Sequence, residues 1–144
     1  MRRFPLIAGL LFAILTIPLI AQPGHKPFYD MSKEVTLSGT VSGVLSHPAA
    51  GMKMYGSHLL LATASGRIDA SLGKWGMAGK GALSVAPGAA VEVTGVMKTI
   101  KDQQVFVVRT VKANGREYTI RNEHGIPVSP QSRERLAAQK GESL

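Results

Sequence analysis

Residues 34–43 have the sequence EVTLSGTVSG, and this stretch decides the fold. Val35, Leu37 and Val41 alternate with serine and threonine, and this period of two predicts a half-buried β-strand. Gly39 and Gly43 inside the segment predict bends, as found where a sheet curls strongly. We therefore expect a curled sheet that closes on itself.

The same alternation recurs along the chain. Further strands are predicted at residues 58–63, 67–72, 91–100 and 105–112, and a short extra strand at 117–121. Tight turns are predicted at residues 64–66, at Pro87-Gly88, at Asp102-Gln103 and at Asn114-Gly115, the last being a strong hairpin signal. Residues 73–84 contain four glycines and predict one short helix or an irregular connection.

Three strands, a connection and two strands form the arrangement of the OB-fold, a five-stranded Greek-key barrel. Closure is favoured because an all-β chain of this size must hide its strand edges or pair them. An SH3-like barrel is the alternative architecture. Ser129 as a cap and Pro130 as the first helical residue predict a short, exposed C-terminal helix.

Residues 1–21, MRRFPLIAGLLFAILTIPLIA, have the layout of a secretory signal peptide. Arg2 and Arg3 are followed by an uncharged run and by a small residue, so cleavage is predicted between Ala21 and Gln22. The alternative is an uncleaved membrane anchor, although the run is shorter than the roughly 20 apolar residues of a spanning helix. We expect a periplasmic or secreted protein that touches the membrane only transiently, through this segment.

These signals divide the chain into four parts. They are a signal peptide at 1–21, an extended arm at 22–33, the barrel domain at 34–128 and a tail or short helix at 129–144.

The composition argues against catalysis. The 144 residues include 17 Lys and Arg against 9 Asp and Glu, a net charge of +8, and no cysteine. Disulfides, thiolate zinc sites and a Cys nucleophile are therefore excluded. The acidic residues lie on separate predicted elements, with Asp69 expected to face solvent or to pair with Arg67 or Arg109. The sequence also lacks the hydrolase, metalloprotease and phosphate-loop motifs, so we expect no enzymatic activity and no cofactor.

A ligand site is predicted at the barrel mouth, between the loop 46–57 and the connection 73–84. Its candidate residues are Met52, Met54, Tyr55, His58 and Trp75. Trp75 is predicted to plug the end of the barrel or to offer a stacking platform. An extended segment would place Met52, Met54 and His58 on one face, and thioether with imidazole ligands suits Cu(I). Copper binding by these three residues is therefore an alternative function.

Nucleic acid is a weaker candidate partner. OB-folds grip single strands with aromatic side chains on the second and third strands and with a basic groove. Segments 58–63 and 67–72 carry no aromatic residue, and Arg67 is their only Lys or Arg. We do not expect nucleic acid, and keep a polyanion or single-strand binder as a further alternative.

Several short motifs follow one another along the chain in an order that suggests a known group of proteins. They are Gly56-x-His58-Leu-Leu-Leu-Ala-Thr63-x-x-Gly66, Ala70-Ser-Leu-Gly-Lys-Trp75, Pro87-Gly88, Val91-Glu-Val-Thr-Gly95 and Ile120-Arg-Asn-Glu-His-Gly-Ile-Pro127. This order resembles a group of small exported bacterial OB-fold proteins of unknown function, some labelled nucleic-acid-binding by fold. The resemblance implies a fold and a compartment but no reaction. Where the group tends to show His-Leu-Gly-Pro-x-Trp, this chain has Ser71-Leu-Gly-Lys-Trp75.

The sequence thus predicts an exported, non-enzymatic OB-fold binding module of the cell envelope. We expect it to be monomeric and to recognise an envelope protein, an oligosaccharide or an anionic polymer.

Overall fold

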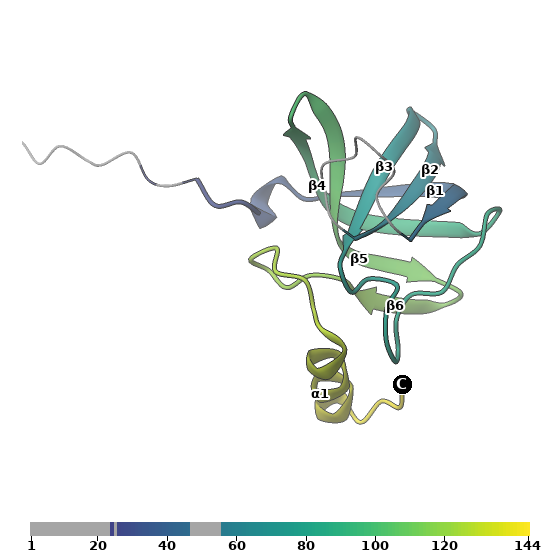
Figure 1. Cartoon of the computed structure of the whole chain (residues 1–144), viewed down its shortest axis with the longest axis vertical. Coiled ribbons are helices and arrows are strands. Elements are labelled where there is room, and N and C mark those ends of the chain that lie inside the picture. Colours follow the sequence, from purple (N-terminus) through teal and green to yellow (C-terminus); the bar gives the residue numbers. More distant parts are fainter. Residues whose placement is uncertain (1–23, 25, 47–55) are drawn as a thin grey trace, which may run out of the picture.

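The computed structural model describes residues 24, 26–46 and 56–144, and the fold is all-β with one short C-terminal helix (Figure 1). The elements, in chain order, are η1 (Met31–Lys33), β1 (Val35–Leu45), β2 (Ser57–Thr63), β3 (Gly66–Gly73), β4 (Ala90–Ile100), β5 (Gln103–Ala113), β6 (Arg116–Thr119) and α1 (Pro130–Lys140). In the described part of the chain, no helix is both long and apolar enough to cross a membrane.

Strands β1 to β5 form a closed barrel, and β6 adds to its outside. The sheet order is β3-β2-β1-β4-β5-β6, and a short pairing between β3 and β5 closes the ring. All neighbours are antiparallel except β3 and β5, which run parallel and pair only at Ala70↔Phe106 and Ser71↔Val107. The predicted five-stranded barrel, its extra strand and its C-terminal helix are confirmed.

The glycines of β1 lie where the strand bends. The register between β1 and β2 shifts between Val41 and Gly43, so the pairing is irregular next to Gly43, one of the two positions where a bend was predicted. At Gly39 a Cβ atom would lie 2.8 Å from the carbonyl oxygen of Ala62, so the two backbones approach too closely for a side chain. The curl lets apolar residues of β1 to β5 enclose one core, including Leu59, Val93 and Phe106.

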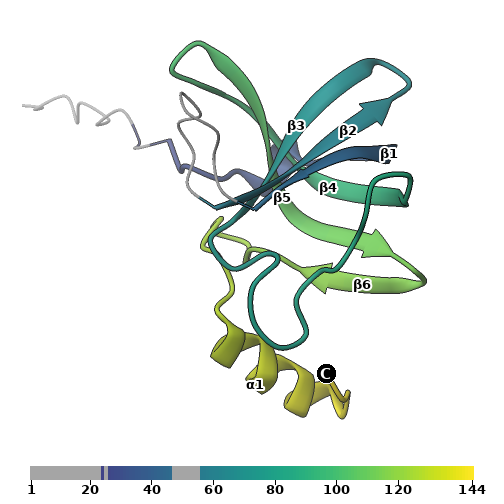
Figure 2. The ribbon, with the colours of Figure 1, turned by 45° about the vertical axis from the view of Figure 1, so that its right-hand side comes forward.

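The two long hairpins and the helix lie at opposite ends of the barrel. Figures 1 and 2 show β2–β3 and β4–β5 projecting on one side, while the connection from β3 to β4 descends toward α1 on the other. Residues 74–89 of this connection form turns without a helix, one of the two outcomes predicted.

One predicted turn is displaced by a residue. The β4–β5 hairpin turns at Lys101 and Asp102, which have φ of 48° and 66°, and Gln103 already belongs to β5. A two-residue hairpin of this type needs positive φ at both central positions, and aspartate adopts it readily. The Asn114–Gly115 hairpin lies where it was predicted, with φ of 54° and 73°.

A buried arginine strengthens the weak closure of the barrel. Arg121 is 3% exposed, and its Nη1 donates to the carbonyl oxygens of Ser71 in β3 and Val108 in β5, both at 2.8 Å. Its Nη2 donates to Ser71 Oγ at 3.2 Å. Burial lowers the pKa of Arg121 to about 10, so the guanidinium stays protonated at neutral pH. Arg121 therefore bridges the two strands just where their own pairing ends.

Replacing Arg121 with methionine should destabilise the barrel strongly. The change leaves two buried carbonyl oxygens without this donor, at about 1–3 kcal/mol each, so we expect a loss of about 2–6 kcal/mol in the free energy of unfolding. Denaturant unfolding measures it. Arg116→Met, at an exposed position of β6, is the control and should change stability by about 0.5 kcal/mol at most. Equal losses in the two variants would contradict the bridging role.

Candidate functional site

The predicted barrel-mouth site is only partly visible. Met52, Met54 and Tyr55 lie outside the described residues, as do Ala21 and Gln22 of the predicted cleavage site. His58 and Trp75 are described, and they take part in different interactions.

His58 is buried at the start of β2 and pairs with an aspartate. Its side chain is 1% exposed, and Nδ1 lies 2.6 Å from Oδ1 of Asp69 on the neighbouring strand β3. Asp69 therefore pairs with His58 and not with Arg67 or Arg109. In the register of β2 and β3 Leu60 lies opposite Asp69, and His58, two residues before Leu60, lies on the same face of the sheet.

Trp75 is half-buried at the start of the connection. Lys74 Nζ lies 4.6 Å from the centroid of its ring, a cation–π distance. The backbone carbonyl of Trp75 accepts a hydrogen bond from Arg133 of α1 at 2.8 Å. Trp75 thus adjoins the helix end of the barrel.

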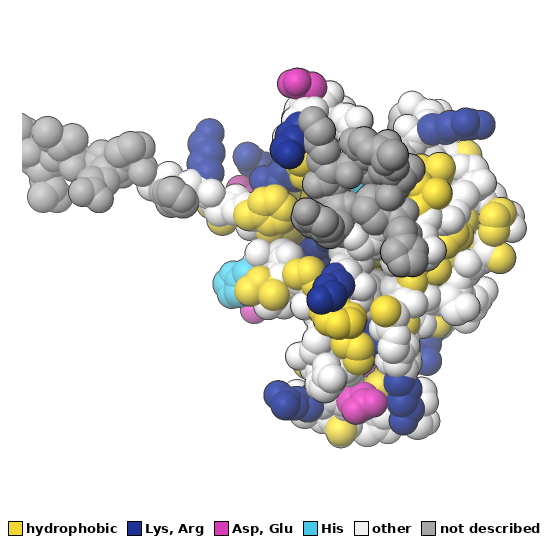
Figure 3. Space-filling model, in the orientation of Figure 1, with side chains coloured by type: hydrophobic (Ala, Val, Ile, Leu, Met, Phe, Trp, Pro, Cys, Tyr) yellow, Lys and Arg dark blue, Asp and Glu magenta, His cyan; other side chains and the backbone are white. Residues whose placement is uncertain are grey.

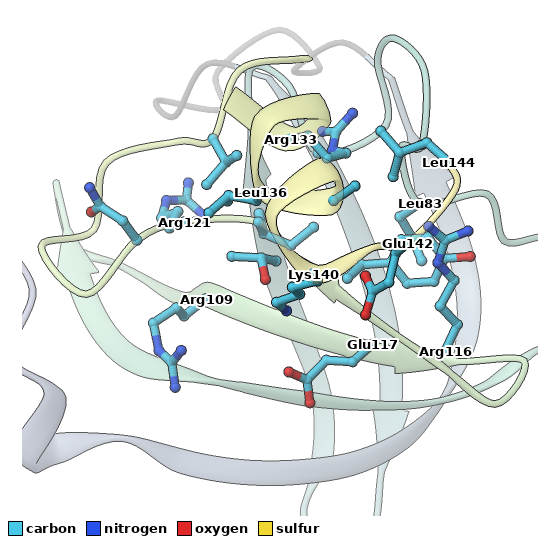
Figure 4. A pocket seen from close by; sticks show the side chains of 18 of the residues that line it. Leu83, Arg109, Arg116, Glu117, Arg121, Arg133, Leu136, Lys140, Glu142 and Leu144 are labelled. Atoms are coloured by element: carbon cyan, nitrogen blue, oxygen red, sulfur yellow. The ribbon is translucent and has the colours of Figure 1, made fainter. Parts of the chain in front are cut away.

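A cavity lies between α1 and the outer strand pair β5–β6 (Figure 4). Its volume is about 370 Å³. We call it the α1 groove. All four residues of β6 line it, together with residues 120–123, Val128, the inner side of α1, the tail residues Glu142 and Leu144, and Gly76, Gly81 and Leu83 of the connection. A cavity of this size is suited to a small ligand or a short stretch of chain.

Local sequence rules place α1 beside the groove. Ser129 caps the helix by accepting from the backbone N–H of Ser132, and Pro130 is its first residue, both as predicted. Gly141 ends it in the left-handed conformation, with φ of 69°. Ala137 is the one buried residue of the helix, so packing alone holds α1 weakly.

Arg133 ties α1 to the connection between β3 and β4. Its Nη1 donates to the carbonyl oxygens of Ala78 at 3.3 Å and Lys80 at 2.9 Å, in addition to the bond to Trp75. Partial burial lowers the pKa of Arg133. The tail closes the same region, because a Cβ atom at Gly81 would lie 2.8 Å from Leu144 Cδ2. The helix and the tail are thus held over the groove mainly by the connection.

The lining of the groove is apolar and charged. Leu83, Leu136 and Leu144 supply apolar surface. The basic side chains in the lining outnumber the acidic ones; they are Arg109, Arg116, Arg121, Arg133 and Lys140, against Glu117, Glu123 and Glu142. Figure 3 shows the outer surface around α1, at the bottom of the view, with basic and acidic side chains interspersed. This lining suits a ligand that carries both apolar surface and negative charge.

A three-residue cluster fixes the N-terminal arm beside the groove. Tyr29 is buried against Val96 and Val107 on the outside of the barrel, and its hydroxyl donates to Glu34 Oε1 at 2.6 Å. Arg109 donates from Nε to Oε1 and from Nη2 to Oε2 of the same carboxylate, the latter at 3.0 Å. The arm therefore reaches the groove, where Met31 and Arg109 belong to the lining.

The charges of this cluster shift each other's ionisation. The guanidinium of Arg109 holds the pKa of Glu34 below its ordinary value, and Glu34 raises the pKa of Arg109. Burial, together with the hydrogen bond to Glu34, raises the pKa of the Tyr29 phenol. The ion pair is therefore fully formed at neutral pH.

Sequence reasoning missed the α1 groove and the arm cluster. Tyr29 and Glu34 lie 75 or more positions before Arg109 in the chain, and no local pattern links them. The available sequence signal was an aromatic residue, Tyr29, in a Pro- and Gly-rich arm. In the described part of the chain, no group of three or more His, Cys, Asp or Glu side chains forms a potential metal site.

Comparison with known families gives one match. Residues 33–118, more than half of the chain, match the model of the MamS/MamX magnetosome protein family. The match covers β1 to β5 and ends within β6, before α1. Searches of curated proteins and of solved structures found no match.

Replacing Glu34 with glutamine should cost stability in a pH-dependent way. Because the pKa of Glu34 is lowered in the folded state, its contribution is complete above the unfolded value of about 4.3 and is lost as the pH falls through the folded value. We expect Glu34→Gln to lower the free energy of unfolding by about 1–3 kcal/mol at pH 7, with the difference shrinking below about pH 4.

Denaturant unfolding between pH 7 and pH 3 measures this difference. Glu92→Gln is the matched control. Among the described residues Glu92 forms one exposed ion pair, with Lys112 at 3.4 Å, so its loss should lower the free energy of unfolding by less than about 1 kcal/mol. A Glu34→Gln deficit that is the same at every pH would contradict an ionic role.

Proposed function

The chain belongs to the MamS/MamX magnetosome protein family, and we propose that it is an exported, non-enzymatic binding module whose ligand occupies the α1 groove. The ligand in this proposal carries negative charge and apolar surface, and the module acts at the magnetosome. The observation that carries the proposal is the groove itself, a concave site beside the barrel with a basic and apolar lining.

The state of the charged groups supports binding over catalysis. Glu34 is engaged by Arg109 and Tyr29. The His58–Asp69 pair has the residue types of an acid–base dyad, but the imidazole is 1% exposed and gives a substrate little access. A site that binds without reacting needs only shape, charge and apolar contact, and the groove offers these.

The N-terminal sequence supports export. Residues 1–21 combine Arg2 and Arg3 with an uncharged run that ends at Ala21, as in secretory signals. The absence of cysteine is compatible with folding outside the cytoplasm, since the barrel needs no disulfide.

Charge reversal in the groove should release the protein from its partner. We compare Arg116→Glu/Lys140→Glu, two exposed cations of the lining, with Arg67→Glu/Arg135→Glu, two exposed cations outside it. Each pair changes the net charge by the same amount. Antibody detection in isolated magnetosomes measures the bound share, without a C-terminal tag that would disturb Leu144.

We expect the groove variant to fall at least fivefold in the magnetosome fraction and the matched variant to stay near wild type. The protein recovered there should begin at Gln22. Equal retention of both variants would overturn the assignment to the groove, and recovery of residues 1–21 would overturn cleavage.

The His58–Asp69 pair favours a second candidate function, copper binding. Asp69 Oδ1 lies 2.6 Å from His58 Nδ1, and a carboxylate beside one ring nitrogen is an arrangement common at metal-bound histidines. Met52 and Met54 would supply thioether ligands for Cu(I).

Cu(I) titration of the purified protein tests this candidate. We expect Met52→Ala/Met54→Ala to weaken binding at least tenfold if copper is the ligand. Met31→Ala/Met97→Ala, which removes two exposed methionines, is the control and should leave the affinity unchanged. Affinity no tighter than that of an isolated Met-containing peptide would exclude this function.

A further inference from the structure

We propose that the α1 groove takes an extended segment of another protein, with alternating acidic and apolar residues, that adds as a strand to the free edge of β6. This inference rests on the proposed function and names its ligand class. It requires an open strand edge, room beside that edge, and side-chain complementarity.

The edge of β6 is open within the described residues. β6 is the last strand in the sheet order, so one side pairs with β5 and the other side pairs with no described strand. All four of its residues, Arg116–Thr119, line the groove. An unpaired edge presents a row of N–H and C=O groups that can template another strand.

The chain itself shows how a strand lies on this edge. After Arg121 it turns back, and Arg121 forms a bridge with Pro127 while the N–H of Val128 donates to the carbonyl of Ile120 at 3.0 Å. Continued in the same register, residues 129–132 would run antiparallel along Thr119–Arg116. Instead Ser129 and Pro130 start α1, and the chain leaves the edge.

An incoming segment would therefore lie along Thr119–Arg116, where residues 129–132 would lie if the chain did not turn into α1. Four strand residues at about 3.3 Å each match the length of β6. The cavity of about 370 Å³ provides room for them beside the edge.

The groove favours acidic and apolar side chains. Three cations of the lining already donate hydrogen bonds within the protein. Arg109 donates to the carboxylate of Glu34, and Arg121 and Arg133 donate to backbone carbonyls. Arg116 and Lys140 are exposed, and within the described part of the chain neither side chain forms a hydrogen bond or an ion pair. The guanidinium of Arg116 lies over the ring of Tyr118, 5.3 Å from its centroid.

On the apolar side, Leu136 is 41% exposed beside Leu83 and Leu144. The side chains of a strand point alternately to two faces. The apolar side chains of the segment would therefore contact the leucines, and its acidic side chains would reach the cations. Glu117 and Glu142 also line the groove, and they disfavour a segment that is acidic at every position.

An eight-residue peptide, acetyl-Thr-Val-Glu-Leu-Glu-Val-Thr-Gly-amide, is the probe. Titration into the isotope-labelled protein, followed by NMR, should perturb the amides of residues 116–119 and slow their hydrogen exchange. Replacing both glutamates of the peptide with lysine should weaken binding at least tenfold. Arg116→Glu/Lys140→Glu should do the same, whereas Arg67→Glu/Arg135→Glu should not.

Backbone methylation of the peptide separates strand addition from other binding. In a strand, alternate N–H groups face the partner edge. N-methylation of one alternate set should therefore abolish binding, and methylation of the other set should leave it within about threefold.

Equal effects of both methylation frames, perturbations outside the groove, or no binding at millimolar peptide would each overturn strand addition. The proposed function fails separately. It fails if the groove variant stays on magnetosomes, whatever the peptide does.

Discussion

The fold depends on closing a barrel with very little pairing. β3 and β5 meet in parallel at only two residue pairs, Ala70↔Phe106 and Ser71↔Val107. Beyond them the strands separate into two projecting hairpins, as Figure 2 shows. The guanidinium of Arg121 donates to a carbonyl on each strand, Ser71 in β3 and Val108 in β5. It therefore links the two strands where their backbone pairing stops. A charged donor suits this position because its hydrogen bonds are stronger than those of neutral groups.

The same segment that closes the barrel also builds the groove. Arg121 anchors residues 120–121 against β5, since both backbone N–H groups point to the carbonyl of Arg109. The following turn, with Asn122 Oδ1 accepting from the N–H groups of His124 and Ile126, brings the chain back along the outer edge. Pro130 then directs it into α1. Stability of the ring and placement of α1 are therefore coupled through a few consecutive residues.

The elements were predictable where local rules decide them. Alternation in 34–43, the Asn114–Gly115 turn and the Ser129–Pro130 helix start each act over a few residues, and each lies where it was predicted. Contacts between distant residues were not predictable. Alternation placed Asp69 on the outer face of its strand but did not name His58 as its partner, and nothing local linked Arg109 to Glu34. The predicted ligand residues Met52, Met54 and Tyr55 lie outside the described residues, so their role stays a prediction.

The net charge of +8 is a poor guide to the ligand, because the arginines serve different purposes. Three arginines line the groove and also hold parts of the structure together. Arg109 binds the carboxylate of Glu34 and holds the N-terminal arm. Arg121 and Arg133 donate to backbone carbonyls, and they hold the barrel closure and α1 respectively. Engaged cations still contribute their field, but their donors are committed to structural contacts. In the proposed binding mode, recognition would depend on the exposed cations Arg116 and Lys140 of the lining and on the backbone edge beside them. A selective partner must therefore match the backbone as well as the charge, and this requirement favours a strand over a simple anion.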